Sequence, residues 1–90
     1  MAELQLSVVV PNRFGIHARP AVLLVKAASG FQADIQVRNG GGYVNAKSLM
    51  SWLSLGAAKG TPLTIWASGH DADRALEAMA ALFETAFDES

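Results

Sequence analysis

The stretch TPLTIWASGHDADRALEAMAALFETAF, residues 61–87, changes from one hydrophobic period to another and decides the fold. In its first part Leu63, Ile65 and Ala67 alternate with other residues, which is the period of a strand with one buried face. Asp71 stands where a helix cap belongs. Beyond it apolar residues recur three and four positions apart, as in an amphipathic helix; they are Ala75, Leu76, Met79, Ala80, Phe83 and Phe87. The stretch therefore predicts a strand, a turn and a helix that buries one face.

The sequence before residue 61 alternates between strands and helices in the same way. Pro11 ends a first strand because it has no N–H to donate to a neighbouring strand, and Gly30 stands where a left-handed helix stop belongs. Asn39 and Gly40 begin a turn between two strands, and Ser48 is a helix cap. The expected elements in chain order are strand 4–10, helix 18–29, strand 33–37, strand 43–45, helix 49–55, strand 61–68 and the last helix.

This order, βαββαβα, predicts an α+β fold. Two strand–helix units around a hairpin are typical of a split β-α-β arrangement. We expect a two-layer open-faced sandwich, in which three helices cover one face of a four-stranded antiparallel sheet. Residues 1–90 show no repeat, linker or low-complexity segment, so they form one domain. The pattern does not assign Trp52 to the core or to the surface.

Composition excludes several classes of protein. The chain has no cysteine and two histidines, which argues against disulfides and a zinc site, so we expect no metal and no cofactor. A net charge of −1 argues against a nucleic-acid partner, which would need a basic face. No basic stretch followed by an apolar stretch opens the chain, so we expect no signal peptide. No apolar stretch approaches the roughly 20 residues of a membrane span, so we expect no membrane insertion. A cytoplasmic protein is the expectation.

The segment around His17 has the chemistry of an anion site. Pro20 is tolerated only in the first turn of a helix, which places His17 at or near the N-cap. Backbone N–H groups there have no intrahelical partner, and the positive helix end favours a neutral imidazole with a nucleophilic lone pair. The same end attracts phosphate, and the guanidinium of Arg19 suits phosphate oxygens. Gly15 and Ala18 are small, which would let a partner approach.

Chemistry alone leaves alternatives open. A lone histidine at a helix start is often only a cap or a surface residue. A hydrolase or metal enzyme is a second alternative, but the sequence offers no paired carboxylate, metal cluster or glycine-rich nucleotide loop beside His17. The residues predict a protein that holds a phosphoryl group, rather than one that activates ATP.

Two motifs carry a resemblance to a known family. The first is GIHARPA, residues 15–21, and the second is VNAKSLM, residues 44–50, continued by Ser54-Leu55-Gly56, Lys59-Gly60 and Gly69. They resemble the phosphorylation-site and regulatory-serine motifs of the HPr family, the histidine phosphocarriers of the bacterial phosphoenolpyruvate-dependent phosphotransferase system. The resemblance covers essentially the whole chain with matching spacing, and it implies the fold predicted above.

The resemblance also implies a mechanism. His17 matches the histidine that enzyme I phosphorylates on Nδ1, with phosphoenolpyruvate as the ultimate donor, and Arg19 matches the arginine that stabilises the phosphoryl group. The phosphate then passes to an enzyme II A component. Such a protein is a carrier in a relay rather than a stand-alone enzyme. A transient interface suits that role, and we expect a monomer.

Docking and regulation are implied in the same way. In the family the first two helices form one apolar patch for donor and acceptor, and the matching residues are Ala18, Val22, Lys26, Leu49, Met50 and Leu53. Ser48 matches the serine that an HPr kinase/phosphorylase modifies in many bacteria. Its alternative role is that of a helix cap alone.

Two further functions stay open. Residues 30–34 and 83–90 are similar to the nitrogen-related branch of the family, whereas residues 45–48 are nearer to the sugar-uptake branch. The chain is therefore expected to serve either sugar uptake or regulation. A transcriptional co-regulator that acts through phosphorylated Ser48 is the other alternative, although such proteins typically lack the histidine.

Overall fold

The computed structural model describes residues 3–89 as one α+β sandwich. Its elements are β1 (Glu3–Val9), α1 (Ala18–Ser29), β2 (Asp34–Arg38), β3 (Val44–Asn45), α2 (Leu49–Ser54), β4 (Pro62–Ser68) and α3 (Ala72–Glu84), followed by a 3-10 turn, Ala86–Asp88. The predicted order βαββαβα is confirmed, and each strand boundary lies within one residue of the predicted one.

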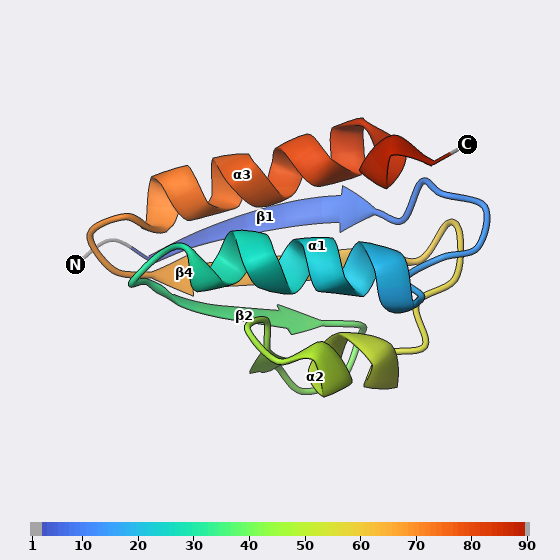
Figure 1. Ribbon diagram of the computed structural model, residues 1–90. Coiled ribbons are helices and arrows are strands. Elements are labelled where there is room, and N and C mark those ends of the chain that lie inside the picture. Colours follow the sequence, from blue (N-terminus) through green and yellow to red (C-terminus); the bar gives the residue numbers. More distant parts are fainter. Residues whose placement is uncertain (1–2, 90) are drawn as a thin grey trace.

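The four strands form one antiparallel sheet in the order β1-β4-β2-β3. The last strand in the sequence thus lies in the centre, paired with β1 on one side and β2 on the other. Helices α1 and α3 run along one face of this sheet, and α2 lies beyond β2 beside β3 (Figure 1). The other face carries no helix in Figure 1, which is the predicted open-faced arrangement.

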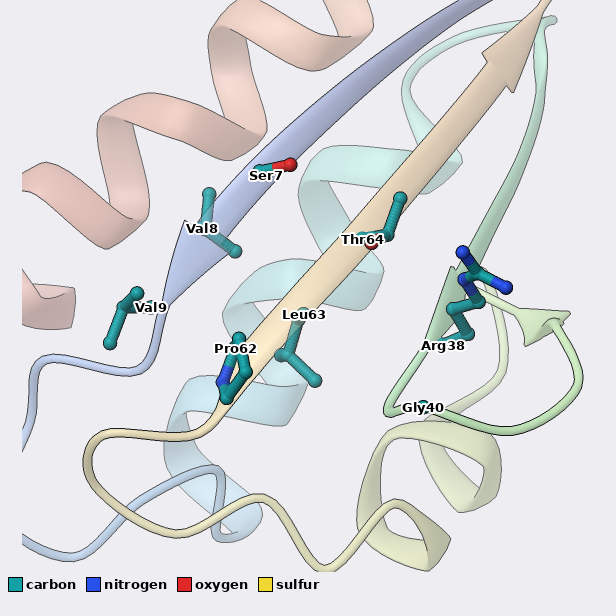
Figure 2. A pocket seen from close by; sticks show the side chains of 8 residues that line it. All are labelled: Ser7, Val8, Val9, Arg38, Gly40, Pro62, Leu63 and Thr64. Atoms are coloured by element: carbon teal, nitrogen blue, oxygen red, sulfur yellow. The ribbon is translucent and has the colours of Figure 1, made fainter.

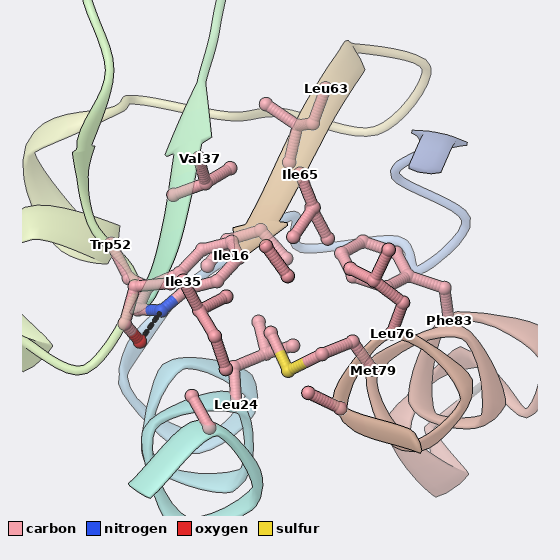
Figure 3. Close-up of a cluster of buried hydrophobic side chains, with 14 of the residues drawn as sticks. Ile16, Leu24, Ile35, Val37, Trp52, Leu63, Ile65, Leu76, Met79 and Phe83 are labelled. Atoms are coloured by element: carbon pink, nitrogen blue, oxygen red, sulfur yellow. Dashed lines mark hydrogen bonds between the residues drawn. The ribbon is translucent and has the colours of Figure 1, made fainter. Parts of the chain in front are cut away.

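The core lies between the sheet and the helices, as the two hydrophobic periods predict. Alternate residues of the central strands point into it, among them Ile35, Val37, Leu63 and Ile65, which are all buried. Figure 3 shows them facing side chains from α1 and α3. Trp52, which the sequence left unassigned, is fully buried, and its indole Nε1 donates a 2.8 Å hydrogen bond to the carbonyl of Ala46 (Figure 3). This bond ties α2 to the turn that precedes it.

Two details of the helix ends differ from the predictions. Gly30 has a φ of −76° in the right-handed region, so α1 does not end in a left-handed stop. Asp71 precedes α3, but its side chain does not cap that helix. Instead its carboxylate accepts hydrogen bonds of 2.9 and 2.8 Å from the backbone N–H groups of Gln32 and Ala33. Asp71 therefore fastens the loop after α1 to the start of α3.

The prediction that the last helix continues through Phe87 is wrong. Helix α3 ends at Glu84, and Ala86, Phe87 and Asp88 have φ values of 50°, 56° and 57°. Phe87 is nevertheless fully buried, with its ring 4.9 Å from that of Phe83. The C-terminal segment thus leaves the path of α3, and the carbonyl of Phe87 accepts a hydrogen bond from Arg19 at the start of α1. Among residues 3–89, no helix has the length and apolar character needed to cross a bilayer.

Candidate functional site around His17

A glycine places His17 at the start of α1. Gly15 is buried and has a φ of +69°, a left-handed conformation that suits a residue without Cβ. A Cβ added here would lie 2.4 Å from the carbonyl oxygen of Ala57. The close approach allows Ile16 N–H to donate a 2.8 Å hydrogen bond to that same oxygen. Gly15 therefore serves this internal contact, and the expectation that its small size leaves room for a partner is wrong.

His17 is the N-cap of α1, as Pro20 predicted. Its backbone is extended, with φ −94° and ψ −166°, and its carbonyl accepts from Ala21 N–H at the first turn of the helix. The imidazole makes no capping hydrogen bond, so it is free to face outward from the helix end. The side chain is 41% exposed. The structure thus presents the ring at a positive helix terminus within reach of another molecule.

The carboxylate of Glu89 contacts this ring. Nε2 of His17 lies 3.0 Å from Oε2 of Glu89 and 3.2 Å from Oε1. Arg19 approaches the same carboxylate, with Nη1 3.2 Å from Oε2. Only 14% of the Glu89 side chain is exposed. The carboxylate of Glu89 therefore contacts both the imidazole of His17 and the guanidinium of Arg19 at the start of α1.

Asn12 also contacts the carboxylate of Glu89. The side chain of Asn12 is buried, and its Nδ2 donates to Gly15 O at 2.6 Å and to Glu89 Oε1 at 2.9 Å. These contacts connect the loop before α1 to the C-terminal segment. The hydrogen bond from Asn12, together with those from His17 and Arg19, holds the pKa of the Glu89 carboxyl below its usual value. Glu89 is therefore a carboxylate at neutral pH.

Arg19 has a second role in holding the C-terminal segment. Its Nη1 donates a 2.9 Å hydrogen bond to the carbonyl oxygen of Phe87 as well as contacting Glu89. Both contacts use Nη1, which leaves Nε and Nη2 as donors for a bound anion. Within residues 3–89, no group of three or more His, Asp or Glu side chains is placed to hold a metal ion. The geometry suits an oxyanion that binds beside His17.

Comparison with known proteins agrees with this fold. Residues 4–85 match the family model described as the phosphorylation site of the PTS HPr component. The chain belongs to the HPr family. It is 44% identical to the phosphocarrier protein HPr of Bacillus anthracis, covering 92% of this chain and 99% of the other with a TM-score of 0.86. It is 39% identical to HPr-C-His of Thermoanaerobacter tengcongensis, covering 100% and 99% of the two chains with a TM-score of 0.90.

A regulatory relative is similar as well. The catabolite repression protein Crh of Bacillus subtilis is 40% identical, with 92% of this chain and 95% of the other covered and a TM-score of 0.73. Crh crystallised as a swapped dimer, so the similarity does not favour a monomer for this chain. As a member of the HPr family, the chain is a phosphocarrier of the phosphotransferase system. Family membership does not identify the partners of this particular HPr.

The residues predicted for docking lie on the surface of the first two helices. Helices α1 and α2 are in contact, and Met50 is the most exposed of their large apolar side chains, at 72%. Phe14, in the loop before His17, is equally exposed and was missed by the sequence reasoning. The predicted residues that are exposed in this HPr fold are Ala18, Val22, Lys26, Leu49, Met50 and Leu53.

Ser48 is the N-cap of α2. Its Oγ accepts a 3.3 Å hydrogen bond from Ser51 N–H, and the side chain is partly exposed. The capping role is thus observed, whereas phosphorylation of Ser48 remains a prediction. Ser48 directly precedes Leu49 and Met50 in the first turn of α2, so a phosphate on Ser48 would lie beside these predicted docking residues.

Three members of the site were missed by sequence reasoning: Asn12, Phe87 and Glu89. Asn12 lies in the loop between β1 and α1, and an asparagine between Pro11 and the motif of residues 15–21 could have been considered as a support for that motif. Glu89 lies 72 residues from His17 and carries no local signal.

Proposed function

We propose that this chain accepts a phosphoryl group from phospho-enzyme I on His17 and passes it to an enzyme II A component. The observation that carries the proposal is the placement of His17. An imidazole stands at the N-cap of α1, beside the Arg19 guanidinium and the unpaired N–H groups of the first turn. These groups stabilise the negative charge of a phosphoryl group. An acid–base pair is not required, because phosphoryl transfer between two nucleophiles depends on their alignment and on charge stabilisation.

The acceptor is tested by labelling. The protein is incubated with enzyme I and phosphoenolpyruvate, and acid-labile, base-stable phosphate is measured. His17→Ala is expected to abolish the label. His70→Ala is the matched control, because His70 is the second histidine and lies exposed before α3. Label that survives in His17→Ala, or that disappears in His70→Ala, would place the acceptor elsewhere.

Arg19 supports the proposal through its charge and its shape. The Arg19 side chain is 54% exposed, and its guanidinium keeps Nε and Nη2 for a phosphoryl oxygen. Arg19→Ala should slow labelling, and Arg19→Lys should restore part of the rate because it keeps the charge and loses the planar fork. The loss of stability should be small, on the order of 1 kcal/mol, and should come mostly from the lost hydrogen bond to the Phe87 carbonyl, since the ion pair of an exposed arginine contributes little. Equal labelling rates in the native chain, Arg19→Ala and Arg19→Lys would show that Arg19 does not take part in phosphoryl transfer.

The docking surface for both partners is proposed to be the exposed apolar face of α1 and α2. Met50→Glu places a charge on this face, at its most exposed apolar side chain, and should weaken binding of enzyme I. Val9→Glu is the control, because Val9 is also exposed but lies on β1. Equal binding of enzyme I by the two variants would contradict the assignment. An analytical sedimentation experiment on the free chain tests the expected monomer.

A second function is favoured by the similarity to Crh and by the position of Ser48. In this alternative the chain is a co-regulator, phosphorylated on Ser48 by an HPr kinase/phosphorylase, that binds a transcription factor. The regulator should bind its partner only in one phosphorylation state, so a pull-down with and without phosphate on Ser48 separates the two functions. Sugar uptake and nitrogen-related regulation are distinguished by which enzyme II A component takes the phosphate from the labelled chain.

A further inference from the structure

We propose that Glu89 fixes the tautomer of His17 and thereby makes Nδ1 the nitrogen that receives the phosphoryl group. This inference rests on the proposed function of His17. It assigns Glu89 as a positioning residue, which acts through the imidazole and does not itself react. Glu89 lies outside residues 4–85, the part of the chain that the family model matches.

The argument begins with the protons. A carboxylate can only accept hydrogen bonds, and both of its oxygens lie within 3.2 Å of His17 Nε2. Nε2 must therefore carry the proton that makes these contacts hydrogen bonds. A neutral imidazole has one ring proton, so Nδ1 is left with a free lone pair. Among residues 3–89 no side chain donates a hydrogen bond to Nδ1, and that lone pair stays available for attack.

The carboxylate can select a tautomer only if it is itself held in place. Asn12 donates to Oε1 at 2.9 Å from a buried position, and Arg19 donates to Oε2 at 3.2 Å. The chain just before Glu89 is held by the buried ring of Phe87 and by its carbonyl, which accepts from Arg19. Each oxygen of Glu89 thus has a partner besides the imidazole, and the carboxylate is fixed from two sides.

Phosphoryl transfer to Nδ1 needs no proton transfer when Nε2 carries the ring proton. The lone pair of Nδ1 forms a bond to phosphorus, while the bond from phosphorus to the donor atom of phospho-enzyme I breaks and its electron pair stays on the donor. The proton on Nε2 does not move. The ring then carries a positive charge, which the adjacent Glu89 carboxylate stabilises. Transfer to the acceptor reverses these changes.

The test uses ring nitrogen NMR of the full chain labelled with ¹⁵N, at a pH where His17 is neutral. The native chain should show the Nε2–H form alone. In Glu89→Ala the ¹⁵N signals of the two ring nitrogens should move toward each other as the Nδ1–H form becomes populated. Glu89→Gln keeps the size of the side chain and should shift the signals in the same direction. Glu84→Ala is the matched control, because it removes one exposed carboxylate at the end of α3.

A kinetic measurement separates this inference from the proposed function. The kcat for phosphorylation by enzyme I should fall on the order of tenfold in Glu89→Ala, as for other groups that orient a histidine, while the KM for this protein stays the same. Native tautomers and native kcat in Glu89→Ala would overturn the role of Glu89 while leaving His17 as the acceptor. A native chain that takes no phosphate would overturn the proposed function, whereas the NMR result would still decide the tautomer.

Discussion

Replacing Gly15 by alanine tests whether its close approach to Ala57 positions the His17 loop. The added Cβ would lie 2.4 Å from Ala57 O and 2.9 Å from Ala58 Cα, whereas ordinary contact begins at 3.4 Å. The loop or the carbonyl must therefore move by about 1 Å. This movement breaks the 2.8 Å hydrogen bond from Ile16 N–H to Ala57 O, which costs about 1 kcal/mol.

The backbone conformation adds a second cost. Gly15 has a φ of +69°, and an alanine in the left-handed region costs roughly 1–2 kcal/mol. The free energy of unfolding should therefore fall by about 2–3 kcal/mol in Gly15→Ala. Gly40 is the matched control, because its φ is +72° and a Cβ there would meet no atom within 4 Å. Gly40→Ala should cost only the conformational part, about 1–2 kcal/mol.

Urea unfolding of the three proteins at an unchanged m-value gives the two differences. The effect of removing a glycine from the unfolded chain is common to both variants and cancels between them. Gly15→Ala should also slow phosphorylation of His17, since the loop before α1 is displaced, while Gly40→Ala should not. If both variants lose the same free energy and label at the same rate, the contact with Ala57 does not position the site.

Three further substitutions test the core and its charges. Phe87→Ala should cost about 3–5 kcal/mol because the ring is fully buried against Phe83, and a near-neutral result in thermal unfolding would mean that the C-terminal turn is not anchored. Trp52→Phe should cost roughly 1–3 kcal/mol through lost volume and the lost hydrogen bond to Ala46 O, and native stability in urea would contradict that bond. The hydrogen bond from Gln32 N–H, and with it that from Ala33, lowers the pKa of Asp71 in the folded chain, so the unfolded chain binds the proton more readily. The stabilisation by Asp71 is then complete above the ordinary pKa of 3.8 and is lost as the pH falls through the lower pKa of the folded chain. Asp71→Asn should therefore reduce the loss of unfolding free energy between neutral and acid pH. An unchanged dependence of the unfolding free energy on pH would refute the linkage.

The parts of the fold that depend on hydrophobic period could be predicted from the sequence. The alternation of Leu63, Ile65 and Ala67 places β4 with one buried face, and the structure pairs that strand on both sides. The position of Pro20 located the start of α1, and with it His17, because a proline inside a helix is tolerated only in the first turn. Trp52 could not be assigned, since its burial depends on the carbonyl of Ala46, which the turn before α2 brings to its indole.

The contact between Glu89 and His17 could not be predicted, for a physical reason that lies in the turn before it. Phe87 follows Phe83 by four residues, so the hydrophobic pattern continues the helix and would carry residue 89 away from α1. The chain instead takes three successive left-handed residues, none of them glycine, which local propensity disfavours by roughly 1–2 kcal/mol each. Burial of Phe87 and the hydrogen bond from Arg19 to its carbonyl offset that cost. The turn is thus stabilised by contacts with the site that it completes, and a local sequence pattern does not reveal contacts between residues so far apart in the chain.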